Sequence, residues 1–275
     1  MTTRQIKPLA LPDIPPGDVD MPAPTFEWLS PLDLLVDETY QRDLSDNSVR
    51  LIRKIVGGWD WRRFKPPVVV KTDAGFEVID GQHTAIAAAT HPEITRIPVM
   101  LVEAAELAER ASAFLGHNRD RIAVTPAQMH YAAVAAGDED ALTVAQVCAR
   151  AGVKIARHPP GQGRYRIGET SAVGSLGALI SRRGVKPARE ILQVLVEAGC
   201  APISAEQIRA AEMLLTDAEY SGDIEAADLV TTIIATREDA EREAKTFAAA
   251  HQVPRWKALG IVWFKRKPRG RKRAA

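Results

Sequence analysis

The residues best suited to chemistry form one run, Asp80-Gly81-Gln82-His83-Thr84, between a short β-rich stretch and an alanine-rich one. The first amides of a helix have no partner within the helix and carry partial positive charge, so a glycine turn entering a helix holds phosphate through its backbone. Gly81 permits close approach, and His83 and Thr84 add side-chain donors. The run therefore predicts a phosphate site; the plainer interpretation is a tight strand-to-helix turn with a histidine satisfied by its neighbours.

Two further polar groups stand beside apolar segments. Gln41-Arg42 follows an apolar stretch, and Asn118 and Arg121 follow a segment rich in Leu, Ala and Phe. Arginine side chains make fork-like contacts with phosphate oxygens, and the Asn118 amide is a candidate ligand for an oxygen or a metal-bound water. Each group alone is typical of a solvated loop. Together with the turn they predict one phosphate site: Arg42, Gly81, Gln82, His83, Thr84, Asn118 and Arg121.

A hydrolytic reaction at such a site would need a base within hydrogen-bond reach of a water molecule. The sequence offers four candidates: His83, Asp80, His117 and Asp120. It does not choose among them, so the catalytic residue stays open.

Alternating helix and strand patterns position this run. Ser45-Asp46 predicts the start of a helix that ends at Gly57-Gly58, with its apolar residues on one face. Two β-rich runs, Pro66–Lys71 and Phe76–Ile79, are separated by a glycine-containing turn and predict a hairpin that leads into the run. Ile97–Val102 predicts another strand.

A last helix of this region is predicted over Ala104–Gly116. Its spacing places Glu106 and Arg110 four residues apart, as an ion pair on the solvent side. His117 and Asn118 would then follow the helix.

Beyond Thr125-Pro126, a cap followed by a first-turn proline, helices dominate. The predicted helices are Leu142–Val153, Ser171–Arg183, Pro187–Glu197, Ser204–Leu215, Ile224–Ala250 with a break at Thr236, and Pro254–Lys265. Lys154–His158 and Arg164–Ile167 flank a Pro-Gly-rich loop and predict a basic β-hairpin, with Arg157, Arg164 and Arg166 as candidate DNA contacts.

The charge distribution points to a polyanionic partner. The formal net charge is +1, but seven basic residues lie in the last eleven positions, so the rest of the chain carries −6. Such a tail binds phosphates without sequence preference and with strong salt dependence; a solubilising end is the plainer interpretation. The DNA-binding candidates here are Lys265, Arg266, Lys267, Arg269, Arg271, Lys272 and Arg273. Beside the tail lie Trp256 and Trp263, which are expected to dock the last helix on the rest of the protein rather than to stack on bases.

Composition excludes several classes. Two cysteines are too few for a disulfide framework or a thiolate-rich zinc cluster, which is typical of a reducing cytosol. There is no apolar run of the ~18–20 residues that a membrane span needs, and no signal-peptide pattern. A cytoplasmic protein with no membrane partner is expected, and the oligomeric state, a homodimer included, stays open.

The order of the motifs resembles the ParB/sulfiredoxin superfamily, and specifically its ParB-like N-terminal domain, over about residues 26 to 126. The matching elements are Gln41-Arg42, Asp46–Val56, Pro66–Val70, Asp80–Thr84 and Asn118–Arg121. In this family the turn and the Asn-containing box form a nucleotide-phosphate site, which implies CTP or ATP, with Mg²⁺, as cofactor here.

This sequence differs from the family pattern at several site positions, and these differences limit which of the family's activities are expected. Gln82 stands where sulfiredoxins have their reactive cysteine, which excludes thiol-based reductase chemistry. His117 replaces the glutamate that helps partition proteins bind magnesium. The nearest variant is the Asp-Gly-Gln-His-Arg subgroup, common in mobile-element and DNA-modification regulators, but its final arginine is Thr84 here. The resemblance thus implies a mobile-element or phage context.

The sequence thus predicts an α+β protein: a flexible arm (1–25), a ParB/sulfiredoxin-like domain with a small mixed sheet (26–125), a helical, DNA-contacting domain with one basic hairpin (126–264) and a basic tail (265–275). The expected function is a DNA-associated partition or regulatory protein with a nucleotide site. A nuclease or nucleotide phosphohydrolase using the same site, and a non-catalytic interaction module, are the alternatives.

Overall fold

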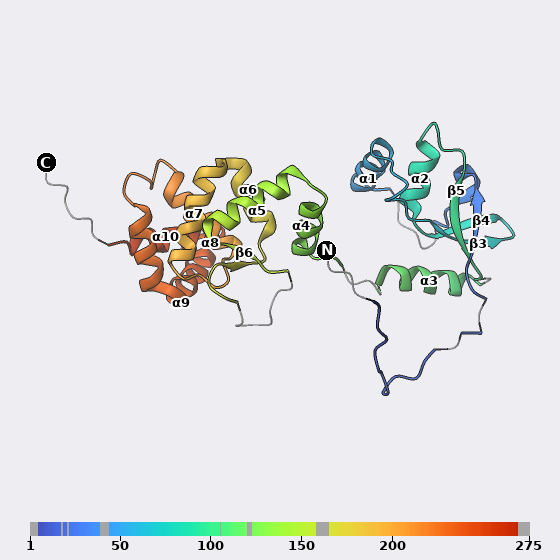
Figure 1. Cartoon of the computed structure of the whole chain (residues 1–275), viewed down its shortest axis with the longest axis horizontal. Coiled ribbons are helices and arrows are strands. Elements are labelled where there is room, and N and C mark those ends of the chain that lie inside the picture. The colour runs from blue at the N-terminus through green and yellow to red at the C-terminus, as the bar shows by residue number, and fades with distance from the viewer. Residues whose placement is uncertain are drawn as a thin grey trace. The chain divides into compact units, whose positions relative to one another are not determined.

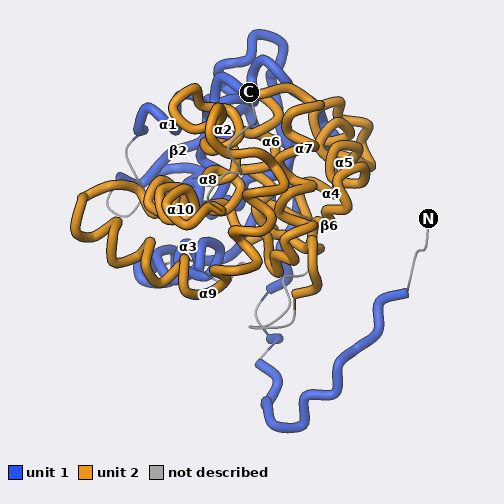
Figure 2. The backbone as a smooth tube through the Cα atoms, turned by 90° about the vertical axis from the view of Figure 1, so that its left-hand side faces the viewer, with its two compact units in different colours: residues 1–122 blue, residues 123–275 orange. Residues whose placement is uncertain are grey.

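The computed structural model describes residues 5–17, 19–20, 22–38, 44–104, 106–119, 123–157 and 165–268, with the side chain of Glu238 left out. The chain divides into two compact units, Met1–Ile122 and Ala123–Ala275 (Figure 2). Residues described before Thr25 contain no helix or strand. No helix among the described residues is both long and apolar enough to cross a bilayer.

Unit 1 contains a five-stranded mixed sheet in the order β1-β5-β3-β4-β2. Its elements are β1 (Thr25–Leu29), a short 3-10 helix η1 (Pro31–Asp33), β2 (Leu34–Leu35), α1 (Asp46–Gly57), β3 (Val68–Thr72), β4 (Gly75–Asp80), α2 (Gln82–Thr90), β5 (Ile97–Val102) and α3 (Leu107–Arg119). The predicted hairpin is confirmed, because β3 and β4 pair antiparallel across the turn with Thr72 opposite Gly75.

Strand periodicity divides the core of unit 1 into two layers. Val69 and Val78 face one side of the sheet, where Ala85 and Ala88 of α2 cover them. Their neighbours Val68, Val70 and Ile79 face the other side, where Phe114 of α3 packs. Figure 1 shows α1 and α2 on one side of this sheet and α3 on the other.

Two predictions about α3 were wrong. The helix runs from Leu107 to Arg119, three residues later than predicted at both ends, because the Glu109 carboxylate accepts from the backbone amide of Glu106 at its start and Gly116 does not end it. Arg110 does not extend into solvent either. Its side chain is 13% exposed and its Nε lies 3.3 Å from Oε2 of Glu77 on β4, since α3 packs on the sheet there.

Unit 2 is almost entirely helical. Its elements are α4 (Pro126–Ala135), α5 (Glu139–Ala151), β6 (Lys154–Ile155), β7 (Glu169–Thr170), α6 (Val173–Arg183), α7 (Val185–Glu197), α8 (Ala205–Thr216), α9 (Ala226–His251) and α10 (Arg255–Lys265). Thr125 and Ser204 cap their helices as reciprocal capping boxes. The long helix α9 is broken at Arg237, one residue from the predicted break.

The α+β class, the mixed sheet and the helical second part are confirmed, but the basic hairpin of unit 2 is wrong. β6 and β7 pair in parallel, with Lys154 opposite Glu169, and a parallel pair cannot be joined as a hairpin. The second strand lies further along the chain than predicted because the loop from Cys200 to Ile203 fixes it: the Gly168 amide donates to the Cys200 carbonyl and the Ile203 amide to the Glu169 carbonyl.

Candidate functional site around the start of helix α2

The turn between β4 and α2 is built for close approach of another group. Gly81 is the N-cap of α2 and has φ +93°, a left-handed conformation that favours glycine. A Cβ at position 81 would lie 2.9 Å from the Cα of Pro67. Since glycine has no side chain, none caps the first amides of the helix, and the α2 N-terminus presents amide donors and partial positive charge at this point.

A pocket of about 290 Å³ opens at this helix N-terminus. Four separate segments line it: α1 through Leu51 and Ile55, the loop before β3 through Lys65, the β4–α2 turn, and α3 through Phe114 and Asn118. The turn contributes Ile79, Asp80, Gly81, Gln82, His83 and Thr84. The pocket therefore joins an apolar wall from two helices to a polar floor at the start of α2.

The structure brings together all the described residues predicted for the phosphate site. Gly81, Gln82, His83, Thr84 and Asn118 line the pocket, and so does Asp80, one of the candidate bases. Asn118 lies in the last turn of α3, four residues after Phe114, and its side-chain Nδ2 donates to the Phe114 carbonyl at 2.8 Å. This hydrogen bond orients the side-chain amide through Nδ2 and does not involve Oδ1.

His117 is not brought into the pocket, because a helix turns about 100° per residue and Asn118 takes the face toward it. Arg42, with Gln41, and Asp120 and Arg121 lie outside the described residues. Of the four candidate bases, the pocket thus contains Asp80 and His83.

Lys65 is a pocket residue that sequence reasoning missed. Its Nζ lies 3.7 Å from Oδ2 of Asp80, and its side chain is 66% exposed. The hairpin register was the available signal: Val68 is opposite Asp80, so the residues before Val68 must lie beside the turn that follows Asp80. Lys65 places a flexible cation at the mouth of the pocket.

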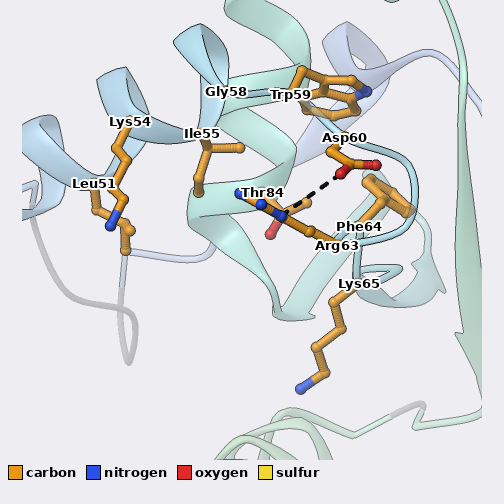
Figure 3. A pocket seen from close by; sticks show the side chains of 10 residues that line it. All are labelled: Leu51, Lys54, Ile55, Gly58, Trp59, Asp60, Arg63, Phe64, Lys65 and Thr84. Atoms are coloured by element: carbon orange, nitrogen blue, oxygen red, sulfur yellow. Dashed lines mark ion pairs between the residues drawn. The ribbon is translucent and has the colours of Figure 1, made fainter. Parts of the chain in front are cut away.

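A second pocket, of about 220 Å³, adjoins the first and shares Leu51, Ile55, Lys65 and Thr84 with it. Its other walls are Lys54, Gly58, Trp59, Asp60, Arg63 and Phe64. Figure 3 shows Arg63 reaching across this pocket from the loop after α1, with its ion pair to Asp60. Thr84 therefore lies between a polar pocket at the α2 N-terminus and a pocket walled by aromatic rings and cations.

The described DNA-binding candidates lie in unit 2. Arg157 is exposed, with its guanidinium 5.2 Å from the centre of the Tyr131 ring, and Arg166 is exposed as well. Lys265 and Lys267 lie over the rings of Phe247 and Phe264, and Lys267 also donates to the Asp223 carbonyl at 2.6 Å. Arg266 pairs with Glu243. Arg164, Arg269, Arg271, Lys272 and Arg273 lie outside the described residues.

The tryptophans beside the tail do dock the last helix. Trp263 is 2% exposed within the core of unit 2, and Trp256 packs against that core beneath the Arg209 guanidinium. The two cysteines are buried free thiols. Among the described residues no three His, Cys, Asp or Glu side chains form a group that could hold a metal ion.

No protein-family model and no curated protein matches this chain. Several solved structures are similar to it, among them the following two. One is the C-terminally truncated chromosome-partitioning protein ParB from Caulobacter crescentus complexed with CTP-gamma-S, at 12% identity and a TM-score of 0.40, over 67% of this chain and 98% of that one. The other is a Pnob8-like ParB-N domain, at 13% identity and a TM-score of 0.29, over 87% and 93% of the two chains.

Proposed function

We propose that the pocket at the start of α2 binds the phosphate groups of a nucleotide and that the chain is a DNA-associated protein of the ParB type, with a partition or regulatory role. The observation that carries the proposal is the convergence of the Gly81 turn and Asn118 on one pocket, although they are distant in sequence. The same two segments carry the sequence resemblance to the ParB/sulfiredoxin superfamily.

The chemistry of the pocket suits a polyphosphate. The amides at the start of α2 are donors, and His83 and Thr84 stand in its first turn. Thr84 occupies the position where the Asp-Gly-Gln-His-Arg subgroup has an arginine, so this chain lacks that positive charge. Lys65 supplies a cation in the same pocket. We infer that Lys65 takes over part of the charge that position 84 has lost.

Magnesium fits this site as a partner of the nucleotide rather than as an ion held by the protein alone. The described ligands that the pocket offers are the Asn118 amide oxygen and the Asp80 carboxylate, and Mg²⁺ is commonly held by one or two protein groups together with substrate phosphates. When bound, Mg²⁺ would neutralise phosphate charge. The family resemblance implies that the nucleotide is CTP or ATP.

The test is binding of fluorescent CTP and ATP to the full chain, with and without Mg²⁺ and DNA. Lys65→Gln and Asn118→Ala should each weaken binding about 10-fold to 100-fold, the equivalent of one hydrogen bond to a charged group. Thr84→Arg should tighten it by a similar factor. Lys71→Gln, an exposed lysine on β3 outside both pockets, should leave it unchanged. Absence of binding, or binding indifferent to Asn118→Ala, contradicts the proposal.

The DNA association is tested through the tail. Lys265, Arg266 and Lys267 have partners within unit 2, so the cleanest truncation follows Pro268 and removes Arg269, Arg271, Lys272 and Arg273. Duplex DNA binding should weaken, and the slope of log affinity against log salt should fall by up to about 3–4. Equal slopes with and without these residues would refute the role of the tail.

A further inference from the structure

A basic segment lies in unit 1, far from the tail. Between residues 46 and 65 six basic residues stand against two aspartates, in a chain whose formal charge without the tail is −6. The basic residues are Arg50, Arg53, Lys54, Arg62, Arg63 and Lys65. Since the rest of the chain is acidic, this local excess of positive charge indicates a surface that attracts a negatively charged partner.

Helix α1 supplies half of these cations on one exposed stripe. Arg50, Arg53 and Lys54 follow the i, i+3, i+4 spacing, while Ile52 is buried on the other side. Arg50 contacts the neutral side-chain oxygen of Asn47 at 3.3 Å. Among the described residues no carboxylate pairs with Arg53 or Lys54, so the stripe keeps its charge.

The loop after α1 adds aromatic rings in fixed positions. Trp59 and Phe64 pack into the sheet core. Trp61 rests on both, with ring centres 5.3 Å and 5.1 Å away, yet remains 49% exposed. Trp28 on β1 lies 6.4 Å from Trp61 and is 55% exposed. Two large ring systems are thus held at the surface by a packed base, which is pre-organised for stacking.

One pocket connects the cations of α1 with the aromatic loop that follows the helix. Lys54 of α1 and Arg63 of the loop line the same pocket as Trp59 and Phe64 (Figure 3). Arg62 and Arg63 share the single carboxylate of Asp60, at 2.8 Å and 3.6 Å, so one of their two charges is left over.

We propose that this stacking face, formed by Arg50, Arg53, Lys54, Arg62, Arg63, Trp61 and Trp28, binds single-stranded nucleic acid. Cations along a helix follow the phosphates, and exposed indoles stack on bases irrespective of sequence. A duplex offers phosphates but keeps its base faces stacked inside, so the exposed rings favour an unpaired strand over the duplex proposed for the tail. The proposal stands independently of the nucleotide site, because it uses neither the α2 turn nor Asn118.

The experiment compares three probes on the full chain: an oligothymidylate, an abasic oligonucleotide of equal length and charge, and a duplex. Oligothymidylate should bind at least about 5-fold more tightly than the abasic strand, the gain from one stacked base, and quench tryptophan fluorescence. Trp61→Leu keeps an apolar side chain but removes the larger part of the stack, since Trp28 rests against Trp61, so it should remove most of this gain. Trp61→Phe should restore part of it.

A second set of variants tests the contribution of the cations to binding. Arg53→Gln with Lys54→Gln should weaken both single strands and lower the salt slope by about 1.4, at about 0.7 per phosphate contact for single strands. The matched control is Lys186→Gln with Lys245→Gln, two exposed lysines of unit 2, which should leave both values unchanged. Circular dichroism and thermal midpoints confirm that each variant is folded.

Three results would overturn the proposal. One is equal affinity for the oligothymidylate and the abasic strand. Another is a base-dependent gain that Trp61→Leu leaves undiminished. The third is self-association of the chain that Trp61→Leu removes while oligonucleotide affinity stays the same, since this would make the face an interface between two copies.

Discussion

The two units use their apolar residues in opposite ways. In unit 1 a sheet separates two thin layers, one with α2 and one with α3. In unit 2 one continuous cluster extends from Ala127 to Trp263 and includes residues of every helix from α4 to α10. The sheet leaves strand ends and a helix start at its edge, where polar groups from distant segments meet. In unit 2 the buried hydroxyls of Thr170, Thr232 and Thr236 donate to backbone carbonyls, and Glu212 is held in ion pairs by Arg182 and Arg183.

This difference predicts where substitutions act. Changes in unit 2 should mainly alter the free energy of unfolding, and changes at the edge of the unit 1 sheet should mainly alter binding. The following predictions test this contrast, from the largest expected effect to the smallest.

Leu192→Ala in α7 should destabilise the protein by about 2–5 kcal/mol, because the side chain is fully buried and its loss leaves a cavity. The free energy of unfolding from urea denaturation measures the effect. Leu142→Ala on α5, where the side chain is 36% exposed, should cost well under half as much. Similar costs at the two positions would show that the core of unit 2 is not continuous.

Gly81→Ala should cost about 1–3 kcal/mol, since the left-handed backbone and the nearby Pro67 both oppose a Cβ. Nucleotide affinity should fall as well. Gly57→Ala, at the end of α1 with open space around it, should be neutral or slightly stabilising. If both substitutions behave alike in thermal unfolding, the α2 turn is not a constrained site.

Glu212→Gln tests the ion pairs that Glu212 forms with Arg182 and Arg183 in unit 2. Burial alone would raise the pKa of Glu212, but hydrogen bonds from Arg182 and Arg183 outweigh it and hold the pKa below its usual range. A carboxylate with a lowered folded-state pKa stabilises the fold above its unfolded pKa, and this contribution is lost as pH falls through the folded pKa.

Glu212→Gln should therefore cost about 1–2 kcal/mol at neutral pH, a modest value because both arginines are partly exposed. The difference from wild type should shrink below about pH 4. Unfolding in urea at neutral and acidic pH measures it. Glu206→Gln, whose partly exposed carboxylate lies 3.5 Å from Arg255, should cost under about 1 kcal/mol at neutral pH. A constant difference across this range contradicts the assignment.

The smallest effect concerns the thiols of unit 2. Burial raises the pKa of Cys148 to about 12 and that of Cys200 to about 11. Because the thiolate is the reactive form, a disulfide reagent at neutral pH should modify neither residue in the folded chain at an appreciable rate. Both should react at once in urea. Rapid reaction of one thiol in the native protein would show that unit 2 opens locally at that position.

Local patterns were enough to predict most elements. Val68 to Val70 read as a strand because β-branched residues fit a pleated surface, and Asp73 to Gly75 read as the turn of a hairpin. Ser45, Thr125 and Ser204 begin helices because their hydroxyls accept from backbone amides within three residues. These signals lie within a few residues of each other, so the sequence contains them completely.

Partners that lie far apart in the sequence could not be predicted in the same way. Glu106, four residues away, was the natural choice for Arg110, but packing of α3 on the sheet brings Glu77 to it instead. Spacing also favoured a hairpin in unit 2, where the Cys200–Ile203 loop holds β7 parallel to β6. In both cases contacts of the folded core outweigh a local preference, which for a helical i,i+4 ion pair is a few tenths of a kcal/mol.

The candidate site shows the same division. The sequence by itself determined the glycine turn, its donors and the Asn118 box, because these are residue types at short spacings. Only the tertiary structure decided that Asn118 faces the turn and His117 does not, that Lys65 joins the pocket, and that Lys54 of α1 lines a pocket with Trp59, on which the exposed Trp61 packs. The physical reason is that strand register and helix rotation fix these meetings, and both are set by burial of apolar residues elsewhere in the unit.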